Sequence, residues 1–389
     1  MEKLYEYMYN RLKDTTSTFF RYKYPEIHWD NRMLGIVGPR GVGKTTLFLQ
    51  HIKKCHSLEN TLYVTADHMY FGNHTLYDTA EVFNKAGGKY LFVDEVHKYD
   101  GWSKELKQIY DSFPDLHVYF TGSSILDIEK GEADLSRRAP KYIMQGMSFR
   151  EYLKIRHNID CPVFSIEDII AGKAEIPLVR HPLQYFKNYL IDGYYPFGTD
   201  IDFSIELSQV ITRTLEVDIP QFANMSMATG KKLKKLITIL AALVPYKPNF
   251  ISLASQISAS RNNVEDYLVH MEKAGMLSIL RDGTGGLGML GKIEKVYLDN
   301  TNIVHLLSDG KADTGTMRET FFLNQMRVNN IVTSSAISDF EIDGKTFEVG
   351  GRSKGQRQIR DAREGYIVKD DIENSHGNIL PLWAFGLNY

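Results

Sequence analysis

The sequence has few of the features that would set it apart from ordinary globular proteins. Only two of its 389 residues are cysteine, Cys55 and Cys161, which excludes a disulfide framework. Neither has a Cys or His neighbour at zinc-ligand spacing, so we expect two reduced, buried thiols. The longest apolar stretch, residues 236–244, is far shorter than the roughly 20 residues that a membrane-spanning helix needs.

An excess of charge of one sign is also missing. The chain has 46 Lys and Arg against 48 Asp and Glu, a formal net charge of -2. This balance argues against a protein that mainly coats nucleic acid or an anionic membrane. A hydrophobic fraction of 43% excludes disorder as the dominant state. Residues 1–13 mix charged and aromatic side chains and lack the apolar core of a secretory signal. We therefore expect a soluble, cytoplasmic protein without a membrane partner.

The first half of the chain alternates short apolar runs with helical patterns. The apolar runs predict strands at 32–37, 61–65, 90–94 and 116–121, and a further strand at 141–149. Helical patterns at 45–54, 79–86 and 104–113 separate the first four. This alternation predicts an α/β fold, with a parallel sheet covered by helices on both faces.

A glycine-rich segment follows the first predicted strand. Residues 38–45, GPRGVGKT, match the pattern G-x-x-x-x-G-K-[ST]. Gly41 and Gly43 remove side chains that would keep phosphates from the backbone N–H groups. Lys44 would contact the β- and γ-phosphates, and Thr45 would offer its hydroxyl to Mg²⁺. The predicted ATP-binding loop is Gly38, Pro39, Arg40, Gly41, Val42, Gly43, Lys44, Thr45 and Thr46.

Two acidic residues end the third predicted strand, in the run YLFVDE at 90–95. Asp94 would hold Mg²⁺ through water, and Glu95 could orient or deprotonate an attacking water. The strand at 116–121 should lie beside the first and third strands. Ser123 or Ser124 could then hydrogen-bond the γ-phosphate or the attacking water. The alternative role for these serines is an N-cap of the next helix.

With these motifs, residues 30 to about 245 resemble an AAA+ ATPase. The resemblance rests on the glycine-rich segment, FVDE at 92–95, FTGSS at 120–124, DLSRR at 134–138 and MSFREYL at 147–153. The last two segments are similar to a prokaryotic AAA+ group whose members carry a C-terminal nuclease-like domain of unknown function. The resemblance implies ATP and Mg²⁺ as ligands and ATP hydrolysis as the activity. One departure is that Ser123 or Ser124 stands where the family usually has a sensor asparagine.

The same resemblance implies an arginine finger just before the last core strand, where Arg137 and Arg138 stand. Such a finger stabilises charge on the γ-phosphoryl oxygens and usually acts on a neighbouring subunit, which implies a homo-oligomer. The alternative is that both arginines are surface charges.

A helix–turn–helix pattern with a glycine-rich hairpin follows. Residues 250–258 and 261–274 predict helices, and 276–281 and 293–298 predict strands, an order that resembles the winged-helix DNA-binding class. The second helix is net acidic, because Glu265, Asp266 and Glu272 outnumber Arg261 and Lys273. A net acidic helix binds phosphates poorly, so a protein contact or a structural role is favoured over DNA binding.

The C-terminal segment resembles the PD-(D/E)xK nuclease fold. A helix at 318–326, strands at 331–333, 339–342, 346–349 and 366–369, and a polar helix at 356–363 are expected. Asp339 and Glu348 would match the two metal-binding carboxylates, and Glu319 the helix glutamate. The lysine of the motif is replaced by Gly350. Lys354 or Arg352 could substitute only if the role of that lysine has moved to another position in the sequence. We therefore expect a degenerate nuclease-like domain used for docking or regulation.

These patterns divide the chain into five parts: an N-terminal helix and connector (1–29), an AAA+ core (30–150), a helical lid (151–245), a winged-helix domain (246–312) and the nuclease-like domain (313–389). The expected function is Mg²⁺-dependent ATP hydrolysis that changes the contact with a protein partner. Two alternatives stay open. One is a nucleotide-dependent switch or scaffold with little turnover, and the other is an ATP-regulated DNA-binding protein or nuclease.

Overall fold

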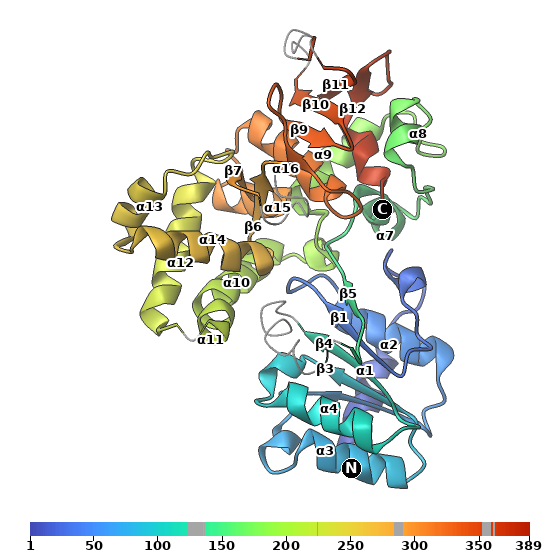
Figure 1. Cartoon of the computed structure of the whole chain (residues 1–389). Helices are drawn as coiled ribbons and strands as arrows, with labels where there is room; N and C mark the ends of the chain where they lie inside the picture. Colours follow the sequence, from blue (N-terminus) through green and yellow to red (C-terminus); the bar gives the residue numbers. More distant parts are fainter. Residues whose placement is uncertain (123–134, 136, 224, 284–290, 352–358, 361) are drawn as a thin grey trace. The chain divides into compact units, whose positions relative to one another are not determined.

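The computed structural model describes residues 1–122, 135, 137–223, 225–283, 291–351, 359–360 and 362–389 (Figure 1). The chain divides into two compact units, unit 1 from Met1 to Gln145 and unit 2 from Gly146 to Tyr389. No helix within the described residues has both the length and the apolar character that crossing a membrane requires.

Unit 1 contains a five-stranded parallel sheet in the order β2-β3-β4-β1-β5. The strands are β1 (Met33–Val37), β2 (Thr61–Thr65), β3 (Tyr90–Asp94), β4 (His117–Gly122) and β5 (Lys141–Ile143). The helices are α1 (Glu2–Lys13), α2 (Lys44–Cys55), α3 (Leu76–Lys85) and α4 (Trp102–Ser112). The predicted α/β class is confirmed, and β4 does lie between β1 and β3.

Helices cover both faces of this sheet because successive strand residues point to opposite sides. In β1, Met33 and Val37 pack in one cluster with residues of α3 and α4, whereas Leu34 and Ile36 pack in another with residues of α2. All five β1 residues are buried, as expected for a strand covered on both sides. The carboxyl ends of the parallel strands therefore meet at one edge, where loops from several strands can combine in a site.

Two expectations for this region are wrong. The strand that begins at Lys141 ends at Ile143 and does not reach Phe149, which instead begins helix α7. Ser148 caps that helix, and it forms a capping box with Glu151 that ends the extended segment. Cys55 is exposed rather than buried, because it stands in the last turn of α2 away from the core, while Cys161 is buried.

Unit 2 begins with helices and continues with a helix–hairpin module, defined here as α13, α14, β6 and β7. The helices are α7 (Phe149–His157), α8 (Ile166–Ile170), α9 (Pro182–Asp192), α10 (Phe203–Arg213), α11 (Ile219–Phe222), α12 (Met227–Ala241), α13 (Phe250–Ile257), α14 (Arg261–Lys273), α15 (Thr301–Leu307) and α16 (Thr314–Met326). The hairpin pairs β6 (Leu277–Arg281) with β7 (Ile293–Leu298) in antiparallel register. Ser260 caps α14, as predicted, by accepting the N–H of Asn263.

A second five-stranded sheet ends the chain, in the order β12-β11-β10-β9-β8. Its strands are β8 (Thr333–Ser334), β9 (Phe340–Ile342), β10 (Lys345–Gly350), β11 (Gly365–Lys369) and β12 (Ile379–Pro381). The last strand was not expected from the sequence. Aromatic residues of α7, α9 and α16 share one core with this sheet and with the buried 3₁₀ helix Leu382–Leu387. The expected polar helix at 356–363 lies largely outside the described residues.

Candidate nucleotide-binding site

The glycine-rich loop connects the carboxyl end of β1 to the amino end of α2. Gly41 and Gly43 have φ angles of 84° and 97°, in the left-handed region that favours glycine. Lys44 begins α2, and its side chain is buried under the loop, where Nζ donates to the carbonyls of Gly38 at 2.9 Å and Pro39 at 2.8 Å. The loop and the helix N-terminus therefore enclose an ammonium group at a position suited to anionic ligands.

Asp94 lies at the end of β3 and accepts three hydroxyl hydrogen bonds while only 3% exposed. Thr45 Oγ1 donates to Oδ2 at 2.7 Å and Tyr63 Oη donates to the same oxygen at 2.8 Å. Thr121 Oγ1, from the end of β4, donates to Oδ1. The hydroxyl of Thr45 and the carboxylate of Asp94, predicted to share a metal, are thus in direct contact.

Tyr63 and Thr121 are site residues that the sequence reasoning missed. Burial, and next the charge of Asp94, raise the pKa of Tyr63 well above its ordinary value, so its hydroxyl stays protonated and donates. Both residues reach Asp94 because β2 and β4 flank β3 in the sheet. The strand order, which no local motif encodes, was needed to find Tyr63. Thr121 had a signal, since it ends the predicted strand two residues before Ser123.

Glu95 follows Asp94 with φ of 54°, a left-handed conformation that is uncommon for a residue with a side chain. Its N–H donates to Thr121 Oγ1 at 3.1 Å, so one threonine holds the backbone of Glu95 and the carboxylate of Asp94. The carboxylate of Glu95 lies 3.6 Å from Nε2 of His97, which is buried. These contacts fix the turn that carries the two acids.

The remaining predicted residues are two serines and two arginines. Ser123 and Ser124 lie outside the described residues. Arg137 is exposed. Arg138 forms a bidentate ion pair with Asp111, in which Nε donates to Oδ1 at 3.0 Å and Nη2 donates to Oδ2 at 3.1 Å. Asp111 stands near the end of α4, just before β4 begins, so Arg138 is near the amino ends of the strands. The glycine-rich loop is at their carboxyl ends, and any action of Arg138 on a γ-phosphate would need the loop of another copy.

The donor set fits a magnesium ion better than a transition metal. Mg²⁺ is usually bound by one or two carboxylates together with phosphates and water. Asp94 and the hydroxyl of Thr45 supply a carboxylate and a neutral oxygen in contact. No group of three or more His, Cys, Asp or Glu suited to a metal occurs among the residues that the structure describes.

In unit 2, the acids predicted for a nuclease-like site are engaged by protein groups. Lys295 of β7 lies 3.5 Å from Glu319 Oε2 and 3.3 Å from Asp339 Oδ1. Tyr297 Oη donates to Glu319 at 2.8 Å, and Ser338 donates to Glu348. Burial, and next the charge of Asp339, raise the pKa of Glu319. The lysine at this cluster comes from β7, whereas Arg352 and Lys354, considered for that place, lie outside the described residues.

Comparison with known families supports the class of unit 1. Residues 30–153 match a family model described as an AAA domain, and this range contains the whole glycine-rich loop, Asp94 and Glu95. This part of the chain is therefore similar to P-loop ATPases, which supports nucleotide binding and hydrolysis. Residues 183–347 match a domain of unknown function, DUF8612. That match does not support a nuclease.

Two proteins of Methanocaldococcus jannaschii are relatives of the chain. The uncharacterized protein MJ1637 is 25% identical over 313 residues, which is 71% of this chain and 66% of that protein. The uncharacterized protein MJ1544 is 26% identical over 267 residues, 65% of this chain and 57% of that protein. The chain thus spans somewhat less than two thirds of the length of these relatives.

Two solved structures are similar in part. The Walker-type ATPase paby2304 of Pyrococcus abyssi aligns with a TM-score of 0.45 at 12% identity, covering 74% of this chain and 95% of that one. C. elegans PCH-2 aligns with a TM-score of 0.26 at 14% identity, covering 68% of each chain.

Proposed function

We propose that the protein binds ATP with Mg²⁺ at the loop of residues 38–46 and hydrolyses the γ-phosphoryl group. The observation that carries this proposal is the contact of Thr45 with Asp94, beside a lysine ammonium buried under the glycine-rich loop. A structural glycine turn needs neither a buried ammonium nor a buried carboxylate. Both charges are what a magnesium–triphosphate ligand requires.

In this mechanism each residue has a separate task. Lys44 pairs with the β- and γ-phosphates, and the backbone N–H groups of the loop hold the phosphate oxygens. Thr45 and Asp94 would hold Mg²⁺, and the ion would supply positive charge that offsets the charge of the phosphate oxygens. Glu95 takes a proton from water as the water oxygen attacks the γ-phosphorus and the bond to the β-phosphate oxygen breaks. Arg137 or Arg138 of a neighbouring copy completes the charge stabilisation.

Phosphate release at saturating ATP tests the assignment. Glu95→Gln should lower turnover by about 10² to 10⁴, the usual contribution of general acid–base catalysis, while nucleotide affinity is largely kept. Lys44→Ala should lower affinity as well. Glu81→Gln is a matched control, because it makes the same acid-to-amide change at a surface ion pair with Lys85. Equal turnover in wild type and Glu95→Gln would refute the role of Glu95 in hydrolysis.

A nucleotide switch with little turnover is the second candidate, and the contact of Glu95 with His97 favours it. The imidazole of His97, 3.6 Å from the carboxylate of Glu95, would compete with water for that carboxylate. Turnover of His97→Gln separates the two functions. A rise in turnover with unchanged ATP affinity would favour the switch, and a rate equal to or below wild type would favour the constitutive ATPase.

We further propose that the helix–hairpin module is a winged helix that contacts a protein. The solvent-exposed residues of α14 include Glu265 and Asp266 as well as Arg261, so the surface has little net positive charge. Binding of a labelled DNA duplex at several salt concentrations tests this. We expect weak binding throughout, whereas tight binding that falls steeply with salt would identify a DNA-binding module instead.

A further inference from the structure

Two consecutive residues before β1 hold the last residue of unit 1. Arg21 is 4% exposed, and its guanidinium donates to the carbonyl of Gln145 at 2.9 Å. Tyr22 Oη accepts the N–H of the same Gln145 at 3.1 Å. Arg21 also donates to the carbonyl of Val42, in the middle of the glycine-rich loop. One guanidinium therefore joins the loop to Gln145, the last residue of unit 1. A guanidinium suits this role because it carries several N–H donors in one plane and can bind two acceptors at once.

The beginning of the same loop packs against Met144, and residues 144–145 are called the exit segment here. The N–H of Met144 donates to the carbonyl of Val37 at 2.8 Å. A Cβ atom on Gly38 would lie 2.1 Å from the carbonyl oxygen of Met144, so only glycine permits this approach. The loop thus contacts the exit segment at Gly38 and, through Arg21, at Val42. A rearrangement of the loop has to move this segment or break these contacts.

Nucleotide binding gives a reason for the loop to rearrange. In the present arrangement the ammonium of Lys44 donates to two loop carbonyls, those of Gly38 and Pro39. Phosphate oxygens bind an ammonium more strongly than neutral carbonyls do, because they carry charge. A bound triphosphate would draw Lys44 away from these carbonyls. The loop would then exist in two states that differ in hydrogen bonding, as a ligand-driven change requires.

On the other side of the junction, the first residues of unit 2 are held by its buried groups. Tyr389 Oη donates to the carbonyl of Gly146 at 3.2 Å, and Ser148 Oγ donates to the Tyr389 carbonyl at 2.8 Å. The N–H of Met147 donates to the carbonyl of Tyr194 at 2.7 Å. A displacement at Gly146 would therefore reach Tyr389 directly.

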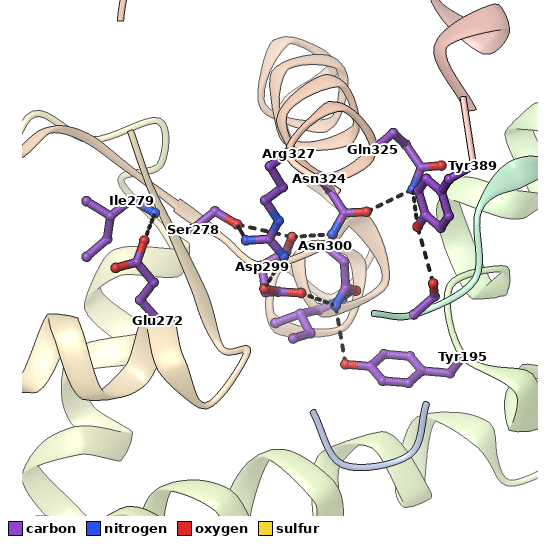
Figure 2. Close-up of polar contacts among 12 residues, drawn as sticks. Tyr195, Glu272, Ser278, Ile279, Asp299, Asn300, Asn324, Gln325, Arg327 and Tyr389 are labelled. Carbon is purple, nitrogen blue, oxygen red and sulfur yellow. Dashed lines mark hydrogen bonds and ion pairs between the residues drawn. The ribbon is translucent and has the colours of Figure 1, made fainter. Parts of the chain in front are cut away.

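From Tyr389 a chain of polar contacts leads to the hairpin of the helix–hairpin module (Figure 2). Gln325 Nε2 donates to Tyr389 Oη at 3.3 Å and to Asn324 Oδ1 at 2.9 Å. Asn324 Nδ2 donates to the carbonyl of Asp299 at 2.9 Å, and Asp299 pairs with Arg327, which donates to Ser278 of β6. All of these contacts are within unit 2.

We propose that Arg21 is a positioning residue that couples nucleotide occupancy of the loop to the Gln145–Gly146 junction, from which Tyr389 and the network of Figure 2 connect to the hairpin of unit 2. The proposal rests on the proposed function, since it requires nucleotide to bind at the loop. Because such coupling is reciprocal, a ligand that fixes the junction would also change ATP affinity, and effects of roughly 5- to 150-fold are typical.

Hydrogen exchange followed by mass spectrometry tests the coupling in the full-length protein, with and without a non-hydrolysable ATP analogue and Mg²⁺. The peptide that contains residues 144–148 is the readout. Each variant is measured at nucleotide concentrations well above its own dissociation constant, so that occupancy is equal. In the wild type, nucleotide should change the exchange rate of this peptide at least threefold. Arg21→Met, at equal occupancy, should lose most of that change.

Two further variants separate the parts of the contact. Tyr22→Phe removes the acceptor for the Gln145 N–H, so the nucleotide response at the junction should shrink while affinity stays within about twofold of wild type. Lys23→Gln removes a nearby charge that pairs with Glu26 at 2.6 Å, and it should behave as wild type. If Arg21→Met does not fold, which its melting curve would show, Tyr22→Phe still tests the junction.

Three results would overturn the proposal. The first is a wild type that binds nucleotide without any change at residues 144–148. The second is a full wild-type response in Arg21→Met and Tyr22→Phe at equal occupancy. The third is the absence of any nucleotide binding by the wild type. That result would refute the proposed function as well, and it is recognised by a flat binding titration.

Discussion

The ion pair of buried Asp299 with Arg327, whose side chain is 22% exposed, leads to a prediction about the stability of unit 2. Arg327 Nη2 lies 2.6 Å from Asp299 Oδ1, and Asp299 is 1% exposed (Figure 2). Burial acts to lower the pKa of Arg327, but the charge of Asp299, the hydrogen bond to it and the influence of Tyr194 and Glu272 together outweigh burial, so the pKa is raised above its ordinary value. The arginine therefore keeps its charge, and removing it would leave the carboxylate of Asp299 buried without compensation.

Breaking a buried pair by removing one partner costs about 3–5 kcal/mol. We expect a loss of this order in the free energy of unfolding of unit 2 for Arg327→Met, which leaves the buried Asp299 unpaired. The loss for Asp299→Asn should be smaller, because Arg327 is partly exposed to water. The double variant leaves no unpaired charge. Its loss should therefore be smaller than the sum of the two single losses by about 2 kcal/mol or more. A loss of this size is a large part of the stability of a typical domain, about 5–15 kcal/mol.

Hydrogen exchange in increasing urea measures this loss for each unit separately. Peptides from α16 and β6 report on unit 2, and peptides from α2 and β3 provide an internal reference in unit 1. In the single variants, only the unit 2 peptides should become unprotected at lower urea. Single losses below about 1 kcal/mol, or a double variant that is simply additive, would show that the pair is not the main source of stability here.

Three further predictions concern one or two side chains each. Thr121→Val should lower ATP turnover about tenfold or more with unchanged melting of unit 2, because hydrogen bonds to charged groups contribute about 1.5–3 kcal/mol. Burial lowers the pKa of His51 to about 3 and of His56 to about 4, so below pH 6.5 the unfolded chain binds protons that the folded chain excludes. Urea titrations should show the stability of unit 1 falling from pH 6.5 to 4, by about 1–3 kcal/mol after allowance for solvent screening, and a flat profile would contradict this. Lys295→Met should destabilise unit 2 more at pH 8 than at pH 5 in melting experiments. The already raised pKa of Glu319 would rise further without the lysine, and only a protonated Glu319 can stay buried without that positive charge. Equal destabilisation at both pH values would contradict this prediction.

The sequence was most informative where function depends on neighbouring residues. The glycine-rich loop, Lys44 and Thr45 form one continuous segment, and Asp94 with Glu95 ends a strand that its apolar run makes visible. The helices α13 and α14 and their hairpin were also predicted close to their observed bounds. In each case the signal is local, because caps, apolar periodicity and glycine positions act within a few residues.

The sequence did not predict contacts that join segments far apart in the chain. Tyr63 reaches Asp94 across 31 positions and Arg21 reaches Gln145 across 124, and nothing near either residue in the sequence marks its partner. At the acids of unit 2, a lysine comes from β7, whereas the motif position holds Gly350. The apolar pattern predicts a strand from Lys141 to Phe149, although Ser148 and Glu151 form a capping box that marks the start of a helix.

The sequence by itself determined the chemical groups that unit 1 offers, because the glycine-rich loop and the acidic strand end are each a run of consecutive residues. Only the tertiary structure decided which side chains complete the site. Parallel strands bring their carboxyl ends to one edge in an order that differs from chain order, so β2 and β4 deliver Tyr63 and Thr121 to Asp94. It also decided that Arg21 bridges the loop and the end of unit 1, because a buried guanidinium takes whichever carbonyls folding places within its reach.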